Sequence, residues 1–100
     1  MKLLTLESIF TILTDSKLGL IALHSLVLST APGGVKMVEL AVNTKTTTAN
    51  MTGTVDRLEK FGLVERHRDV YDRRIVLVSA TDKGKDLVSD YRDKLEQAQR

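Results

Sequence analysis

The sequence contains no cysteine, which excludes disulfides, thiolate-bound zinc and thiol-based sensing of oxidants. It has only two histidines, so few side chains remain from which a metal site could be built. The longest apolar run, Leu18–Leu28, is interrupted by Gly19, His24 and Ser25 and is too short to cross a bilayer. The first residues lack a small-residue cleavage site, and we therefore expect a cytoplasmic protein that does not contact membranes.

Sequence motifs of the common enzyme classes are also missing. There is no Gly-rich phosphate loop, no Gly-x-Ser-x-Gly and no His-Glu-x-x-His. His24 and His67 lie far apart in the sequence, and each is expected to be structural or to donate a hydrogen bond to a phosphate. We predict a protein that is not an enzyme and that has no cofactor and no metal site.

The net charge is only +2, but the basic surplus is confined to one part of the chain. Residues 44–78 contain seven Lys or Arg against five Asp or Glu, whereas the two charge signs cancel in the segments on either side. A local cationic surplus favours an anionic partner, although so small a difference is also typical of an ordinary solvated surface.

Hydrophobic spacing and capping residues predict one domain of α+β class, mostly helical. Thr47 or Thr46 can cap a helix that ends at Phe61, where Gly62 provides the left-handed stop. Two strand-like runs, Leu63–Arg68 and the more β-branched Arg73–Ser79, then predict a hairpin, and Thr81 caps a last helix. The predicted order within 1–100 is N-terminal helices in 1–30, a helix-turn-helix in 35–61, a two-stranded β wing in 63–79 and a C-terminal helix in 81–99.

The helix that ends at Phe61 has an outward face suited to the DNA major groove. If Met51, Val55 and Leu58 point inward, Asn50 is left able to pair with adenine and Arg57 to reach guanine or phosphate. Ala49 and Gly53 would let the backbone approach base edges, and the N–H groups at Thr47 and Thr48 could hold a phosphate. The alternative is a plain solvated helix whose threonines bond to its own backbone.

Several motifs in the same order resemble the MarR family of transcriptional regulators. They are Glu39-Leu40-Ala41, the stretch from Thr54 to Arg66, Asp72-Arg73-Arg74 and Thr81-Asp82-Lys83-Gly84. The resemblance covers about residues 18–87. It implies that the helix of residues 47–61 enters the major groove and that the hairpin is a wing, in which Asp72 steadies Arg74 as that arginine reaches the minor groove.

The sequence departs from the family pattern at a few positions. Thr44 and Thr46 stand where the family usually has apolar residues, so a more loosely packed turn is expected. Gly53 replaces a common base-contacting arginine, which implies a different DNA sequence preference. Compared with the family pattern, we expect this sequence to lack the last helix and to have a short first one; in the family both helices belong to the dimer interface and line the ligand pocket.

These arguments lead to a predicted set of functional residues. The predicted DNA contacts are Lys45, Thr47, Thr48, Ala49, Asn50, Thr52, Gly53, Arg57, Arg66, Arg68, Arg73 and Arg74, with Asp72 as wing support. The predicted dimer contacts are Leu6, Phe10, Leu87, Val88, Tyr91 and Leu95. The alternative for the helical stripe among them is that it covers the domain's own core.

The predicted function is sequence-specific binding of double-stranded DNA by a homodimeric regulator, most simply a repressor, that is cytoplasmic and nucleoid-associated in a prokaryotic or phage setting. One alternative is a winged helix that docks on another protein, favoured by the lack of Arg or Lys between Thr46 and Asp56. The other is a ligand-gated sensor of small aromatic compounds, which the family resemblance allows.

Overall fold

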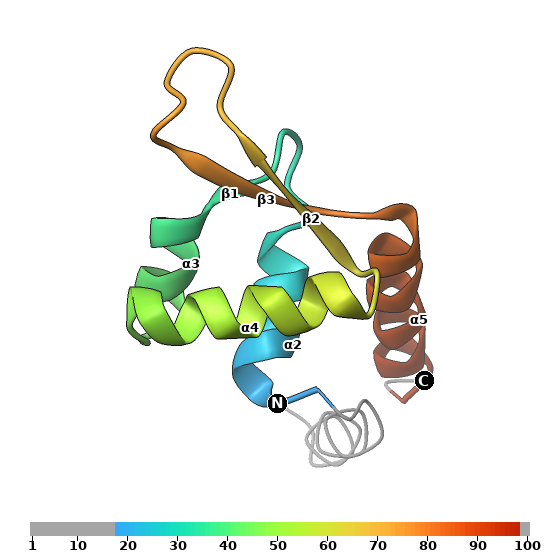
Figure 1. Ribbon diagram of the computed structural model, residues 1–100. Helices are drawn as coiled ribbons and strands as arrows, with labels where there is room; N and C mark the ends of the chain where they lie inside the picture. The colour runs from blue at the N-terminus through green and yellow to red at the C-terminus, as the bar shows by residue number, and fades with distance from the viewer. Residues whose placement is uncertain (1–17, 99–100) are drawn as a thin grey trace.

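The computed structural model describes residues 18–98 of the chain. Its elements follow in the order α2 (Leu20–Leu28), β1 (Val35–Lys36), α3 (Met37–Asn43), α4 (Thr48–Lys60), β2 (Val64–Arg68), β3 (Val76–Ala80) and α5 (Asp82–Ala98), as Figure 1 shows. The predicted winged helix-turn-helix is confirmed. The helix expected before residue 18, with Leu6 and Phe10, lies outside the described residues.

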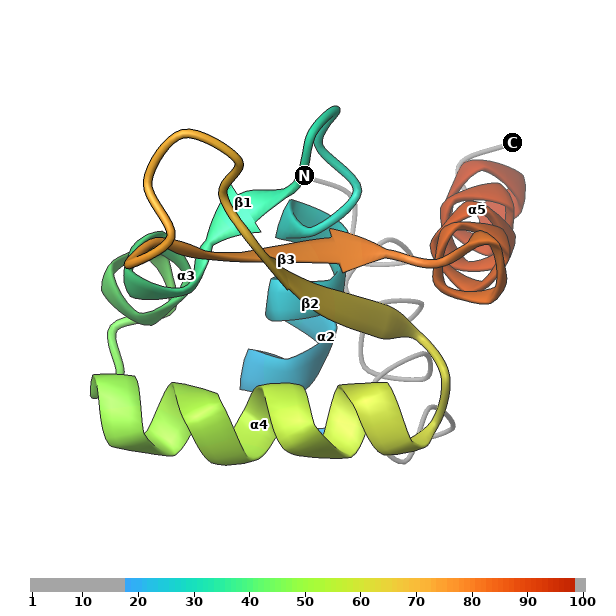
Figure 2. The same ribbon diagram turned by 45° about the horizontal axis from the view of Figure 1, so that its top comes forward.

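The core lies where α2, α3 and α4 meet the strands. Leu26 of α2, Leu40 of α3, Leu58 of α4 and Val78 of β3 are completely buried. Each such side chain contributes about 1.5–3 kcal/mol through removal of apolar surface from water. Packing against this common core fixes α4 relative to α3 and to the strands, and Figure 2 shows α4 lying along one side of the molecule.

The ends of α4 form as the sequence predicts. The Thr47 hydroxyl oxygen accepts a hydrogen bond of 3.0 Å from the backbone N–H of Asn50, which satisfies one of the unpaired donors of the first turn. Gly62 follows the helix with φ of 75°, a left-handed conformation that suits glycine. The chain is thereby turned directly from α4 into β2.

The start of α5 is hydrogen-bonded to the turn between α4 and β2. Thr81 Oγ1 accepts a 3.1 Å bond from the backbone N–H of Gly84 and donates a 2.6 Å bond to the carbonyl of Gly62. A Cβ on Gly84 would lie 2.1 Å from the carbonyl oxygen of Leu63, so only glycine allows this approach. The Thr-Asp-Lys-Gly motif therefore joins α5 to the base of the wing.

The wing sheet differs from the prediction in having three strands, in the order β1-β3-β2. Strand β1 pairs antiparallel with β3, with Val35 opposite Val78. The two strands come together at Gly34, where a Cβ would lie 2.4 Å from Ser79 Oγ. A two-residue strand has no periodic pattern, which is why the sequence did not reveal it.

The wing turn is also longer than predicted. Strand β3 begins at Val76 instead of Arg73, because the backbone N–H of Ile75 bonds to the carbonyl of Asp72 at 3.0 Å and closes a turn there. The strand β2 starts within one residue of the expected position. No helix within residues 18–98 is both long enough and apolar enough to cross a membrane.

Candidate nucleic-acid interface

The N-terminal half of α4 presents an uncharged polar face to solvent. Met51, Val55 and Leu58 are completely buried, which confirms the predicted inward face. The predicted contact residues of this segment are exposed: Thr47, Thr48, Ala49, Asn50, Thr52, Gly53 and Arg57. Apart from Arg57, these side chains are small or amide groups that can approach base edges, since none of them carries a charge that must first be desolvated.

The turn before α4 is held by hydroxyl groups at the positions where the family usually has apolar residues. Thr44 Oγ1 donates a 2.6 Å bond to the carbonyl of Leu40. Thr46 Oγ1 accepts a 3.3 Å bond from Nδ2 of Asn50. Between them Lys45 adopts a left-handed conformation with φ of 58°, which turns the chain sharply and leaves its side chain exposed. The turn is thus ordered by hydrogen bonds, and it presents a cation beside the start of α4.

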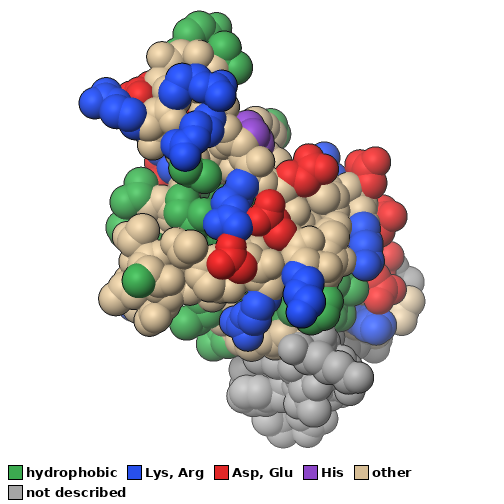
Figure 3. All heavy atoms as spheres, viewed as in Figure 1, with side chains coloured by type: hydrophobic (Ala, Val, Ile, Leu, Met, Phe, Trp, Pro, Cys, Tyr) green, Lys and Arg blue, Asp and Glu red, His purple; other side chains and the backbone are tan. Residues whose placement is uncertain are grey.

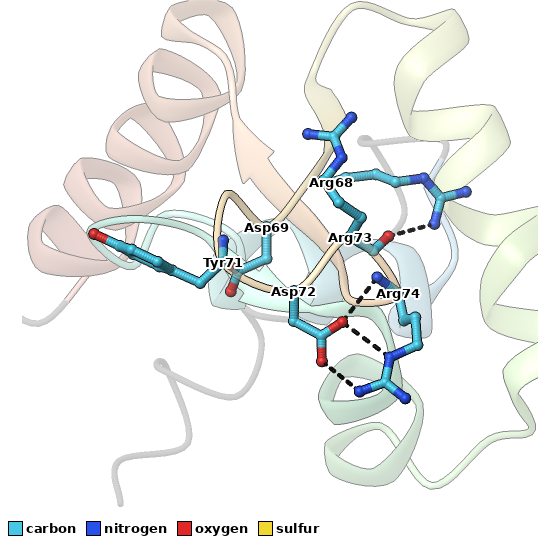
Figure 4. Close-up of polar contacts among 6 residues, drawn as sticks. All are labelled: Arg68, Asp69, Tyr71, Asp72, Arg73 and Arg74. Atoms are coloured by element: carbon cyan, nitrogen blue, oxygen red, sulfur yellow. Dashed lines mark hydrogen bonds and ion pairs between the residues drawn. The ribbon is translucent and has the colours of Figure 1, made fainter.

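The wing turn is built around Asp72. Its carboxylate accepts bonds of 3.0 Å from Nε and 3.0 Å from Nη2 of Arg74, and a third of 3.1 Å from the Arg74 backbone N–H (Figure 4). These contacts lower the pKa of Asp72, chiefly through the hydrogen bond from the Arg74 side chain, and raise that of Arg74. The predicted support of Arg74 by Asp72 is present, and the guanidinium remains 91% exposed.

The other wing residues are oriented by short local contacts. Nη1 of Arg68 donates a 2.9 Å bond to the backbone carbonyl of Arg73. Oδ1 of Asp69 accepts a 2.7 Å bond from the backbone N–H of Tyr71, whose ring is 98% exposed at the tip of the turn. Figure 4 shows the Tyr71 ring pointing away from the three arginines. One side of the wing is therefore cationic and the other side carries an aromatic ring.

A groove of about 810 Å³ separates the wing from the start of α4. Basic side chains gather on the wing above it (Figure 3). Its lining combines Thr48 and Thr52 of α4 with Lys36, Arg66, His67, Arg68 and Arg74, over the apolar Met37, Val38, Ile75 and Val76. The structure thus brings together five of the predicted DNA contacts. Lys36 was not predicted, because only the fold places it beside α4. His67, expected to be either structural or a phosphate donor, also lines this groove.

The remaining predicted contacts lie outside this groove. Ala49, Asn50, Gly53 and Arg57 line a shallower hollow of about 520 Å³ on the other side of α4, next to Ile21. Lys45 and Arg73 are exposed and line neither hollow. Within residues 18–98, no three His, Asp or Glu side chains gather where they could hold a metal ion.

Arg66 is less accessible than the other predicted cations. Its Nε donates a 2.8 Å bond to Oε1 of Glu59, and its Nη2 contacts both that oxygen, at 2.6 Å, and Oδ1 of Asp56. The pKa of Arg66 is raised, first by its hydrogen bond with Asp56. This pairing joins β2 to α4 and was not foreseen, although the acids at positions 56 and 59 stand one turn apart on the helix.

The predicted dimer stripe on α5 has two parts. Val88 is only 6% exposed and belongs to the chain's own core, whereas Leu87, Tyr91 and Leu95 are half-buried. Lys94 lies over the Tyr91 ring, with Nζ 5.8 Å from the ring centre. The interpretation of the stripe as core cover thus holds for Val88 and in part for Leu87, which packs against the same core. Leu87, Tyr91 and Leu95 retain accessible surface.

Comparison with known proteins gives consistent results. The MarR family model matches residues 24–76. The HTH-type transcriptional regulator YfiV of Bacillus subtilis is 38% identical over 55 residues, which are 55% of this chain, and the chain spans about a third (34%) of that relative. CouR from Rhodococcus jostii RHA1, solved with p-coumaroyl-CoA, is 30% identical with a TM-score of 0.79, over 94% of this chain and 66% of CouR.

A third comparison concerns the fold alone. MepR of S. aureus, solved as a complex with DNA, has a TM-score of 0.84 at 19% identity, over 94% of this chain and 77% of MepR. The family model covers more than half of the chain, including α3, α4 and most of the wing. The chain belongs to the MarR family.

Proposed function

We propose that the protein is a transcriptional regulator that binds a specific sequence of double-stranded DNA as a homodimer and acts as a repressor by occupying an operator. The observation that carries this proposal is the juxtaposition of an uncharged, exposed helix face with a cationic β hairpin across one groove. A helix of this kind fits the major groove, while an arginine on a narrow arm fits the minor groove. The setting would be the cytoplasm of a prokaryote, at the nucleoid.

Base recognition falls to the exposed side chains of α4. Asn50 can pair with adenine, while Ala49 and the methyl groups of Thr48 and Thr52 can contact thymine. Gly53 has no atom within 4 Å of its Cβ position, so the helix backbone is open to close approach there. Arg57 is exposed one turn further on and can reach a guanine or a phosphate.

Phosphate contacts fall to cations around this face. Lys45 lies at the turn before α4, Arg68 and Arg73 lie on the wing, and the backbone N–H groups at Thr47 and Thr48 form the positive end of the α4 dipole. Arg74, held by Asp72 yet 91% exposed, is the side chain positioned for the minor groove.

The experiment begins with selection of bound duplexes from a random pool, followed by titration of the best duplex at several salt concentrations. We expect affinity to fall steeply with salt, because each phosphate contact releases about one counterion. Arg57→Ala and Arg74→Ala should each weaken binding by roughly tenfold or more, equivalent to about 1–3 kcal/mol. Lys85→Ala is the matched control, since Lys85 is an exposed cation on α5 that does not line the groove.

The same titration tests the alternative of a protein-docking module. A winged helix that binds protein would not retain a duplex sequence through selection, and its weak DNA binding would not depend on Arg57. Unchanged affinity in both arginine variants would reject the proposed roles of these residues.

Regulation by a small molecule is a second candidate, favoured by the 30% identity to CouR, which was solved with p-coumaroyl-CoA. Aromatic acids and aromatic acyl thioesters are the compounds to test. A ligand at a concentration 100 times its Kd would stabilise the folded protein by about 2.7 kcal/mol, which thermal unfolding detects readily.

A further inference from the structure

Three charged side chains join the C-terminal half of α4 to strand β2. Arg66 of β2 contacts both Asp56 and Glu59 of α4, and the Nε and Nη2 groups of its guanidinium donate to their carboxylates. The side chains of Arg66 and Glu59 are 30% and 34% exposed, so their contact is partly shielded from water. Two acids against one base leave this cluster, which we call the acid–arginine clamp, with a net charge of −1.

The clamp borders the groove proposed to receive DNA. Arg66 lines that groove together with Thr48 and Thr52, and Asp56 follows these two residues at four-residue spacing along α4. The carboxylate of Asp56 is 56% exposed on the same helix. Without Arg66, two acidic side chains would face the region through which a phosphate backbone must pass, and like charges in such an interface are strongly unfavourable.

Arg66 differs in this respect from Arg74, the other paired arginine of the groove. The side chain of Arg74 is 91% exposed and is held by one carboxylate, so its guanidinium can contact a ligand while it remains paired. Arg66 is 30% exposed and is held by two carboxylates. Those contacts use Nε and Nη2 of Arg66, so only Nη1 is left for a phosphate. A guanidinium that turned fully toward a phosphate would leave both acids uncompensated beside it.

We propose that Arg66 is a positioning residue, which fixes α4 against β2 and neutralises Asp56 and Glu59 toward DNA, and not a phosphate ligand. This inference rests on the proposed DNA-binding function and deepens it. It replaces the phosphate contact expected from sequence with an indirect role. It also assigns base reading to the uncharged N-terminal half of α4, since the clamp occupies the wing-facing side of the C-terminal half.

The test is a cycle of four proteins: wild type, Arg66→Gln, the double variant Asp56→Asn with Glu59→Gln, and the triple variant that combines all three changes. The amides at positions 56 and 59 keep the size of the acids, and the amide at position 66, although shorter than arginine, can still hydrogen-bond with them. The triple variant is therefore an uncharged version of the clamp. The affinity of each protein for the selected duplex is measured from low to high salt.

We expect Arg66→Gln to weaken binding by about tenfold or more in the wild-type background, because two acids become exposed to the phosphates. In the double-variant background the same change should cost clearly less, because no acid is then left exposed to the phosphates. An equal loss in both backgrounds, with the slope of log affinity against log salt reduced by about one, would identify Arg66 as a phosphate ligand and overturn the proposal.

Two controls make the cycle decisive. The first control is Arg57→Gln. Arg57 is exposed on the same helix and is proposed to contact DNA directly, so its loss should weaken binding equally in both backgrounds. Thermal unfolding without DNA tests whether Arg66 holds α4 against β2. If it does, Arg66→Gln should lower Tm more in the wild type than in the double variant. Equal shifts of Tm would show that the clamp does not hold α4 against β2.

These readouts separate the inference from the function on which it rests. If the wild-type protein selects no duplex, the proposed function fails and the shielding role fails with it, while the unfolding cycle still decides the structural role. If the wild type binds DNA and Arg66→Gln binds equally well, only the inference about Arg66 is rejected.

Discussion

At the scale of single residues, the pair of Asp72 and Arg74 shows how a side chain can be prepared for contact without being buried. Three hydrogen bonds orient the arginine, two of them from its guanidinium to the Asp72 carboxylate. Because the pair is exposed, it contributes little to the stability of the fold, and its value lies in the direction it gives to Arg74. The family resemblance made this pairing predictable, and the two residues lie two positions apart in one turn.

The lowered pKa of Asp72 gives the first prediction. A carboxyl whose pKa is lower in the folded state favours folding above its ordinary pKa of 3.8, and this contribution is lost as the pH falls through the lowered value. NMR titration of the Asp72 carboxyl carbon should place its midpoint below the ordinary value. Arg74→Ala should return the midpoint close to that value, and an unchanged midpoint would show that Arg74 is not the cause.

The cap of α4 gives a second prediction. Thr47→Ala removes the acceptor for the Asn50 N–H and should lower the free energy of unfolding by about 0.5–2 kcal/mol. Thr48→Ala is the matched control, because Thr48 is the neighbouring exposed threonine and does not serve as the cap. Urea denaturation compares the two, and equal losses would mean that the hydroxyl of Thr47 has no special role.

Arg66 could not be assigned from sequence, for a physical reason. Its partners lie seven and ten residues earlier in the chain, and the contact depends on the angle between α4 and β2. That angle is set by the buried packing of α4 and by the turn at Gly62. The sequence therefore gives the charge of a residue in a predicted strand, but it does not show whether that charge is already paired within the fold.

At the scale of helices and strands, periodicity predicted α4 and α5 closely because each has several turns and a threonine cap. It missed β1, whose two residues are defined by pairing with β3 and by the glycine that lets the strands approach. The inward and outward faces of α4 were also predictable, since three buried side chains at helical spacing fix its rotation.

Two helical glycines give a third prediction, in which the same substitution has opposite effects. At Gly53 an added Cβ has no neighbour within 4 Å, so Gly53→Ala should stabilise the protein by about 0.5–1 kcal/mol through the better helix propensity of alanine. At Gly84 the Cβ would lie 2.1 Å from the Leu63 carbonyl oxygen, so Gly84→Ala should destabilise it by about 1–3 kcal/mol or more.

Chemical denaturation measures both glycine variants, and DNA titration adds a functional result for the first. If the α4 backbone approaches base edges, Gly53→Ala should weaken duplex binding although it stabilises the fold. Equal or tighter binding would mean that the helix does not approach the bases closely at this residue.

At the scale of the whole molecule, the absence of tryptophan offers a direct test of the wing. The chain has two tyrosines, and in a Tyr91→Phe variant the exposed Tyr71 at the wing tip becomes the sole tyrosine fluorophore. If the wing enters the minor groove, addition of the selected duplex should quench this emission in parallel with binding measured by DNA anisotropy. Binding without any change in Tyr71 emission would show that the wing tip stays in solvent.

Assembly of the molecule gives the last prediction. A homodimer that uses α5 would bury the accessible surface left on Leu87, Tyr91 and Leu95, and its two-fold symmetry would place two copies of α4 about one helical turn of DNA apart. We expect Leu95→Asp to shift sedimentation toward the monomer. It should also weaken binding to a palindromic duplex much more than binding to a single half-site, since the α4 face and the wing are untouched.

Gln97→Asp is the control, because it introduces the same charge at an exposed position of α5. If Leu95→Asp leaves both sedimentation and the preference for a palindrome unchanged, the copies meet through another surface or bind DNA singly.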